Sequence, residues 1–227
     1  MYYENILPAR FLSRPNRFIA HVELNGIDTV CHVKNTGRCR ELLLPGAEVY
    51  IQASSNPQRK TAYDLIAVRK GDRLVNIDSQ APNRVFGEYA ASGAFLPQLT
   101  LIRPESRFCS SRFDFYVESP AQRAFVEVKG VTLERSGEVL FPDAPTQRGA
   151  RHLTELVACR EQGFDAYAVF IIQMENVRCF RPNGETDPLF ARNLAMAQEA
   201  GVHILAYDCS VTPESLEIRN SVPIILS

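Results

Sequence analysis

Short apolar runs separated by turn residues make up the first third of the chain. Asn25-Gly26, Pro45-Gly46 and Lys70-Gly71-Asp72 separate these runs, and an Asn-Gly pair between apolar runs is a strong β-hairpin signal. The predicted strands cover residues 17–24, 29–33, 49–53, 61–68 and 74–77, with a brief helical piece at 38–43. About five short strands with one helical piece favour a small barrel of the oligonucleotide-binding type, although an SH3-like barrel would give much the same pattern.

From about residue 78 the pattern changes to alternating helices and strands. Asp78 is placed to cap a helix that runs through Val85 and Phe86 to Ala91. The elements predicted after it are strands at 99–103, 111–117, 124–128 and 139–141, a helix at 146–162, a strand at 166–172, a helix at 188–200 and a strand at 202–207. This order predicts an α/β (α+β) domain with a mixed central sheet. We therefore predict two domains, residues 1–80 and 81–227.

Composition and charge narrow the class of protein. The hydrophobic and charged fractions, 45% and 22%, are those of a soluble globular protein. A net charge of −1 argues against a wholly basic nucleic-acid binder, but residues 1–80 carry 11 Lys and Arg against 8 Asp and Glu, and the remainder carries 14 against 18. The amino terminus lacks the features of a signal peptide, and the longest apolar run, 166–172, is too short to cross a bilayer. We predict a cytoplasmic protein with no membrane partner.

Two neighbouring strand-like segments each carry an acidic residue. Asp114 lies in 112–117, and Glu127 and Lys129 lie in 125–130. Side chains at i and i+2 of a strand share one face, and a hairpin return would bring Asp114 beside them. Paired carboxylates can hold Mg²⁺, and the lysine could then orient a water or offset charge on a phosphate. The alternative is that these charged residues only solvate an exposed sheet face.

Two predicted helices border these strands. Arg148, His152 and Glu155 lie at i, i+4 and i+7 of the helix 146–162 and form a polar stripe, which is more often a solvated face than a site. The start of that helix would nevertheless present backbone amides and Arg148 to a phosphate. Glu88, on the preceding helix, is a candidate third carboxylate.

The first domain supplies basic residues interleaved with aromatic ones. On a small barrel, the basic groups would follow a phosphate backbone and exposed rings would stack on bases, unless the rings fill the core and the charges are ordinary surface. The segment Asn35-Thr36-Gly37-Arg38 is a tight turn followed by an arginine that could hold a phosphate. The candidate nucleic-acid-binding residues are Arg14, Arg17, Lys34, Asn35, Arg38, Arg59, Lys60 and, from the second domain, His152.

Four motifs in order resemble the sugar fermentation stimulation protein (SfsA) family. They are Asn35-Thr36-Gly37-Arg38 with 42–46, Ser111 to Phe115, Glu127 to Leu133, and Phe141-Pro142-Asp143 through Arg148-Gly149 to Leu156. The resemblance implies an oligonucleotide-binding barrel followed by a domain like the PD-(D/E)XK nucleases. Asp114, Glu127 and Lys129 match the acids and lysine of that motif, Glu88 resembles an additional helix acid, and Phe113 stands where the motif has proline. Family members are described as DNA-binding proteins linked to regulation of sugar (maltose) metabolism.

We therefore predict a DNA-binding protein with a Mg²⁺- or Mn²⁺-dependent phosphodiesterase site; RNA is an alternative partner, and a homodimer is left open. The predicted metal ligands are Asp114, Glu127 and Glu88, and the predicted catalytic residues are these three with Lys129 and Arg148. The main alternative is a DNA-binding regulator that keeps the nuclease-like fold without its activity. No sequence feature supports a sugar-metabolising enzyme.

Overall fold

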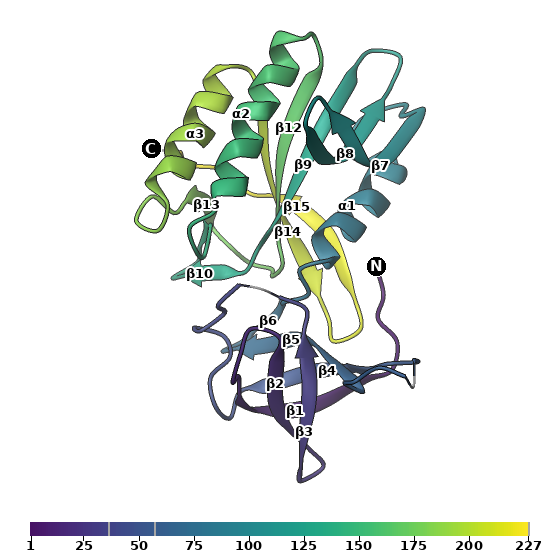
Figure 1. Ribbon diagram of the computed structural model, residues 1–227, viewed down its shortest axis with the longest axis vertical. Coiled ribbons are helices and arrows are strands. Elements are labelled where there is room, and N and C mark those ends of the chain that lie inside the picture. Colours follow the sequence, from purple (N-terminus) through teal and green to yellow (C-terminus); the bar gives the residue numbers. More distant parts are fainter. Residues whose placement is uncertain (36, 57, 227) are drawn as a thin grey trace.

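The computed structural model describes residues 1–35, 37–56 and 58–226, and its first strands form the barrel at the lower end of Figure 1. These strands are β1 (Ile6–Ser13), β2 (Ile19–Leu24), β3 (Ile27–Val33), β4 (Glu48–Ala53), β5 (Tyr63–Lys70) and β6 (Arg73–Asn76). The sheet order is β3-β2-β1-β4-β5-β6, and a parallel pairing of β3 with β5 closes the first five strands into a ring. The predicted small barrel is confirmed.

Alternation of buried and exposed residues places the barrel core. Val49 and Ile51 are buried in β4, and Ala20 and Val22 are buried in β2. The predicted Asn25-Gly26 hairpin joins β2 to β3, and both of its residues have positive φ, as the tight turn requires.

Two local predictions for the barrel differ from the structure. Strand β1 was not predicted, because Pro8 and Arg10 interrupt its apolar pattern and Phe11 is its one fully buried residue. The predicted helical piece at 38–43 is a turn in which the amide of Leu43 donates to the carbonyl of Cys39 at 2.9 Å. Pro45 and Gly46 follow after one further residue, so a helix cannot continue.

The second domain contains a mixed central sheet, as predicted, and this sheet has six strands. Its strands are β7 (Leu101–Phe108), β8 (Ser111–Glu118), β9 (Arg123–Val131), β12 (Asp165–Ile172), β14 (His203–Val211) and β15 (Leu216–Ser221), in the order β15-β14-β12-β9-β8-β7. Strands β9, β12 and β14 run parallel, and the outer pairings are antiparallel. A smaller sheet joins β10 (Leu133–Arg135), β11 (Glu138–Phe141) and β13 (Cys179–Pro182).

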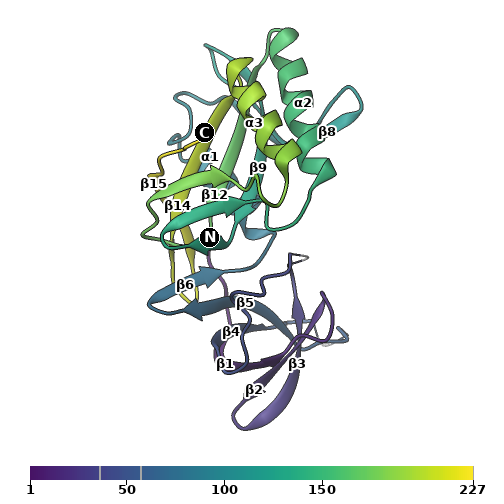
Figure 2. The ribbon, with the colours of Figure 1, turned by 90° about the vertical axis from the view of Figure 1, so that its left-hand side faces the viewer.

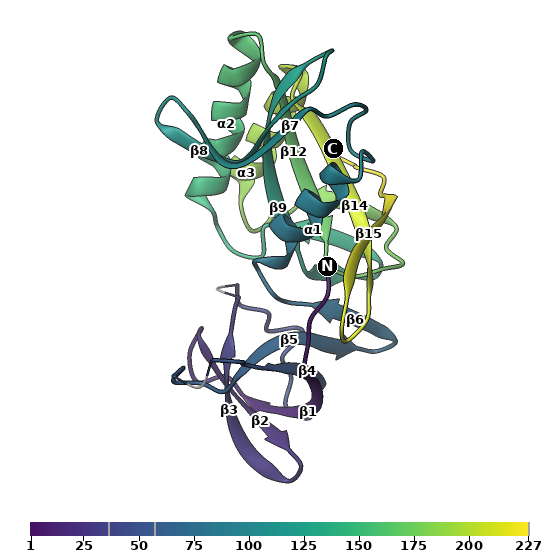
Figure 3. The same cartoon turned by 90° about the vertical axis from the view of Figure 1, so that its right-hand side faces the viewer.

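Helices cover both faces of the large sheet. Helices α2 (Gln147–Glu161) and α3 (Pro188–Glu199) pack side by side on one face, seen in Figure 2, and α1 (Ala81–Ala91) lies on the other, seen in Figure 3. The residue at the N-cap of α1 is Gln80 rather than the predicted Asp78. The carboxylate of Asp78, two residues earlier, accepts the backbone amide of Gln80. Within the described residues, no helix combines the length and apolar character needed to cross a bilayer.

Polar contacts join the two domains closely. Strand β6 ends at Asn76 and α1 begins at Ala81, so the predicted boundary at residue 80 falls between them. The first residues lie on the second domain, however, because the amide of Tyr3 donates to the carbonyl of Glu214 at 2.7 Å. Buried Gln173 of the second domain donates to the side chain of Asn76 at 2.9 Å. The barrel therefore sits at a defined place against the base of the second domain (Figure 1).

Candidate metal centre and nucleic-acid interface

Asp114 lies where strand pairing in the sheet is interrupted on both sides. Strands β8 and β9 pair as far as Phe115 and Val126 and separate beyond them. On the other side, Glu105 should face Asp114 from β7, but this pair is missing from the register and Glu105 has a φ of 53°. A non-glycine residue in this region of backbone space is uncommon and often accompanies a functional site.

The carboxylate of Asp114 occupies the gap that the separated strands leave. One oxygen, Oδ2, accepts the backbone amide of Val128 at 2.7 Å, and the other, Oδ1, accepts the side-chain amide of Asn83 at 2.7 Å. Asn83 belongs to α1, so a helix and two strands fix this carboxylate. Burial raises the pKa of Asp114, and the nearby charge of Glu127 raises it further.

Glu127 is nearly completely buried and its two oxygens have different surroundings. Oε1 contacts Nδ1 of His152 and Nζ of Lys129. Oε2 is buried and has no hydrogen-bond partner among the residues that the structure describes. Burial acts to raise the pKa of Glu127, but the bonds from His152 and Lys129 outweigh it, so the pKa lies below its ordinary value. Glu127 is therefore an ionised carboxylate, and one of its oxygens has no hydrogen-bond partner among the described residues.

His152 holds Glu127 in place from α2. Its Nε2 lies 3.4 Å from the Nε of Arg148, which can only donate, so Nε2 accepts and Nδ1 carries the proton toward Glu127. The imidazole is 3% exposed. The ring therefore lies under the surface, where it contacts Glu127, and its predicted role in nucleic-acid binding stays a prediction. Arg148 itself is exposed at the start of α2, where Thr146 caps the helix by accepting the amide of Gly149.

Glu88 does not join the acid pair, which corrects the predicted set of three metal ligands. Its carboxylate is half exposed and pairs with the amino group of Met1 at 2.7 Å and with Arg84 at 3.4 Å. Asn83, on the same helix, approaches Asp114 instead. In the described part of the chain, no three or more His, Cys, Asp or Glu side chains gather as a metal site. The site therefore has two acids, Asp114 and Glu127.

Several of the predicted nucleic-acid-binding residues have structural partners inside the barrel. The Arg14 guanidinium donates to four carbonyls, those of Arg17, Asn35, Gly37 and Arg38, at 2.7–3.0 Å. Arg59 forms a two-pronged ion pair with buried Asp64, and Lys34 lies 3.3 Å from the same carboxylate. These cations are committed to the fold, because their charges are already neutralised or their donors used.

Asn35 is also used locally, and three predicted cations remain exposed. Asn35 accepts the amide of Gly37 and donates to the carbonyl of Ile77, which shapes the loop. Thr36, the second residue of the predicted phosphate-holding turn, lies outside the described residues. The side chains of Arg17, Arg38 and Lys60 are exposed.

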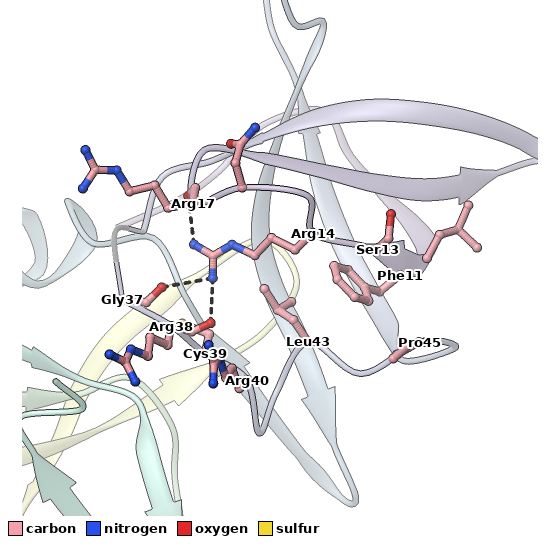
Figure 4. A pocket seen from close by; sticks show the side chains of 12 residues that line it. Phe11, Ser13, Arg14, Arg17, Gly37, Arg38, Cys39, Arg40, Leu43 and Pro45 are labelled. Atoms are coloured by element: carbon pink, nitrogen blue, oxygen red, sulfur yellow. Dashed lines mark hydrogen bonds between the residues drawn. The ribbon is translucent and has the colours of Figure 1, made fainter. Parts of the chain in front are cut away.

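An open pocket of about 510 Å³ on the barrel gathers three of the exposed arginines (Figure 4). Arg17, Arg38 and Arg40 line it, and Leu12 and Pro45 contribute apolar surface. Among the described residues that line it, none is acidic. The sequence prediction omitted Arg40 from the binding set, although its position two residues after Arg38 was the available signal. The pocket therefore presents concentrated positive charge beside apolar side chains, which suits a nucleic-acid strand.

Comparisons with known proteins cover both domains. A family model described as "SfsA N-terminal OB domain" matches residues 12–77, and one described as "Sugar fermentation stimulation protein RE domain" matches residues 80–215. The chain belongs to the sugar fermentation stimulation protein (SfsA) family. SfsA homologues from Clostridium beijerinckii and Desulfitobacterium hafniense are each 54% identical over 226 residues, and cover 99–100% of both chains.

A solved SfsA structure has the same fold as this chain. It is the Pyrococcus furiosus SfsA protein in complex with Ca²⁺, which is 30% identical, superposes with a TM-score of 0.90, and covers 99% of this chain and 98% of its own. The arrangement of barrel and second domain is therefore that of an SfsA protein.

Proposed function

We propose that this SfsA-family protein binds nucleic acid along its barrel and hydrolyses phosphodiester bonds beside Asp114 and Glu127, which would hold Mg²⁺ or Mn²⁺. The observation that carries the proposal is the buried Oε2 of Glu127, which lacks a partner among the described residues. A buried acceptor without a partner costs about 1–3 kcal/mol, and more when charged. A divalent cation would remove this cost. Each oxygen of Asp114 accepts one bond and keeps a second lone pair for a metal.

The chemistry of the donors fits a hard cation. Carboxylate oxygens are the ligands that Mg²⁺ and Mn²⁺ favour, and Ca²⁺ takes the same kind of ligand. The Pyrococcus furiosus relative was solved in complex with Ca²⁺, which supports cation binding in this family. The acids and lysine also follow the order of the PD-(D/E)XK motif, which supports phosphodiester hydrolysis as the reaction.

The residues around the acid pair would have separate roles. When bound, the metal would polarise the phosphate and lower the pKa of a coordinated water. Lys129, which donates to Glu127, is placed to orient the attacking water and to offset developing negative charge. Arg148 is exposed at the start of α2 and would contact a phosphate, while His152 holds the orientation of Glu127.

The test is cleavage of labelled single- and double-stranded DNA and RNA with Mg²⁺, Mn²⁺ or chelator. We expect metal-dependent cleavage that Asp114→Asn and Glu127→Gln abolish, because each removes a metal-binding oxygen. Glu185→Gln is the matched control, because Glu185 is 86% exposed and pairs only at the surface. Calorimetric titration with Ca²⁺ should show binding to the wild type and the control, and loss of binding in the two site variants.

Nucleic-acid binding without cleavage on every substrate and metal would instead identify a DNA-binding regulator. Ca²⁺ titrations that are the same for the wild type and both site variants would remove Asp114 and Glu127 from the metal site.

The barrel surface is tested through the salt dependence of binding. Arg38→Ala should weaken binding similarly across sequences and reduce the slope of log affinity against log salt by about 0.7 for single strands, as expected for one lost phosphate contact. Arg192→Ala, which removes an exposed arginine from α3, should leave the slope unchanged. An unchanged slope in Arg38→Ala would exclude this residue from the interface.

A further inference from the structure

A second, smaller cavity lies in the seam between the domains, and it is lined by Gly130, two residues after Val128, whose amide donates to Asp114. Its volume is about 170 Å³, the space of roughly six water molecules at about 30 Å³ each. Asn35 and Gly37 contribute the barrel side, and Gly130, which follows Lys129 in β9, contributes the other side. This cavity is separate from the arginine-lined pocket of Figure 4, and the proposed activity leaves it without a role.

The orientation of Gln173 gives this cavity a fixed acceptor. The Gln173 amide nitrogen donates to Oδ1 of Asn76 at 2.9 Å and to the carbonyl of Asp78 at 3.0 Å, so its amide cannot be flipped without losing both bonds. Its Oε1 therefore points away from these partners and lies against Gly130, where an added Cβ would approach it to 2.6 Å. The side chain is 1% exposed, and the cavity is the open space that it lines.

Asp143 and Thr132 provide further oxygens. Oδ2 of Asp143 accepts the backbone amide of Arg38 at 3.1 Å. Within the described residues, the other oxygen of Asp143 and the hydroxyl of Thr132 make no hydrogen bond or ion pair. No lysine, arginine or histidine is among the described residues that line the cavity. The cavity is thus rich in acceptors and carries negative charge, so it would repel a phosphate and favour a group that donates hydrogen bonds.

We propose that this cavity binds an unpaired nucleobase through its exocyclic amino group, next to the phosphate that is cleaved. Adenine, cytosine and guanine carry such an amino group, whereas uracil and thymine carry none and have a carbonyl at C4, where cytosine has its amino group. Leu133, Leu140 and Phe141 line the same cavity and provide apolar contact for the faces of a base. This inference rests on the proposed function, because it requires a nucleic-acid strand that passes from the barrel to the acid pair.

The test compares single-stranded oligo(dC) with oligo(dU). At C4 cytosine presents an amino group and uracil a carbonyl, and at N3 cytosine accepts a hydrogen bond whereas uracil donates one. Binding is measured by fluorescence anisotropy in chelator, so that no strand is cleaved. We expect the wild type to bind oligo(dC) about tenfold more tightly than oligo(dU), within the range of base discrimination by paired hydrogen bonds. Homopolymers present the same base in every register.

Asp143→Asn provides the decisive variant, because its carbonyl oxygen can still accept the Arg38 amide while a hydrogen-bond donor, its amide NH2, replaces the other oxygen of a residue that lines the cavity. We expect the preference for oligo(dC) to disappear or to reverse. Asp28→Asn, an exposed barrel residue that pairs with His21, is the matched control and should keep the wild-type preference. Equal binding of both oligonucleotides by the wild type, or a preference that Asp143→Asn leaves unchanged, would overturn the inference while nucleic-acid binding stands. Failure to bind either oligonucleotide would overturn the inference, and binding of duplex DNA or RNA by the same protein would then decide whether the proposed function stands.

Discussion

The ion cluster around Glu134 offers a direct measure of how strongly the two domains are joined. Glu134 of β10 is 6% exposed and pairs with Lys70 and Arg73 of the barrel, both at 2.7 Å. It also accepts the amide of Gly137. Burial alone would raise the pKa of Glu134, but Lys70, Gly137 and Arg73 together hold it at about 2, against an ordinary 4.5. We expect Glu134→Gln to destabilise the folded protein at neutral pH.

The magnitude follows from this pKa. The pKa of Glu134 lies about 2.5 below its ordinary value, and a pKa change of one corresponds to about 1.4 kcal/mol. The contribution to the free energy of unfolding is therefore roughly 3 kcal/mol as an upper value. Lys70 and Arg73 are partly exposed, so solvent screening reduces the expected loss to about 1–2 kcal/mol. Because the folded pKa is depressed, this stabilisation is complete above pH 4.5 and is lost as the pH falls toward 2. The effect of Glu134→Gln should therefore shrink across that range.

Urea denaturation at a series of pH values measures both effects. Glu185→Gln serves as the control, because Glu185 is 86% exposed, and it should change the free energy of unfolding by less than about 0.5 kcal/mol at any pH. If Glu134→Gln were as stable as the wild type at pH 7, or lost the same free energy at pH 3 as at pH 7, the ion cluster would not hold the domains together.

Three further predictions concern single positions. Gly130→Ala should lower the free energy of unfolding by about 1–3 kcal/mol, because its Cβ would lie 2.6 Å from the side-chain oxygen of Gln173 and 2.7 Å from the ring of Pro82. Gly184→Ala is the control, because its Cβ would meet its nearest atom at 3.7 Å, and thermal denaturation should show it to be neutral. Arg14→Lys keeps the charge but cannot donate to four carbonyls at once, so denaturant titration should show a free energy of unfolding lower by about 2 kcal/mol. An unchanged denaturation midpoint would contradict the structural role of the Arg14 guanidinium. His152→Leu should weaken Ca²⁺ binding about 10–100-fold by calorimetry, because it removes the donor that orients Glu127, while His152→Gln should recover part of the affinity.

The sequence predicted the elements that have a strong local signal. The Asn25-Gly26 hairpin, the helix at 146–162 and the strand at 166–172 follow from turn chemistry, period and length, and all three are present. The third strand of the smaller sheet, β13 (Cys179–Pro182), and the edge strand β15 (Leu216–Ser221) were missed. Their short or exposed sequences have little pattern of their own, because pairing with distant strands decides them.

Side-chain partners account for what sequence could not show about the site. Asp114 and Glu127 were recognised from alternation within two strands, but the interruption of strand pairing around Asp114 depends on its neighbours. Glu88 carried the right chemistry on the right helix, yet its carboxylate faces the first residue of the chain. Arg14 and Arg59 were correctly read as cations, but sequence does not show which cations have internal partners.

The position of Gln173 has a consequence for how this protein can be divided. Its amide is oriented by Asn76 and Asp78, which come from the end of the barrel and the connection to α1. A second domain produced alone would keep the acidic pair but would lose the groups that orient this amide. The barrel is therefore not an exchangeable module: replacing it with another binding domain would alter a wall of the neighbouring cavity as well as the surface that holds the strand.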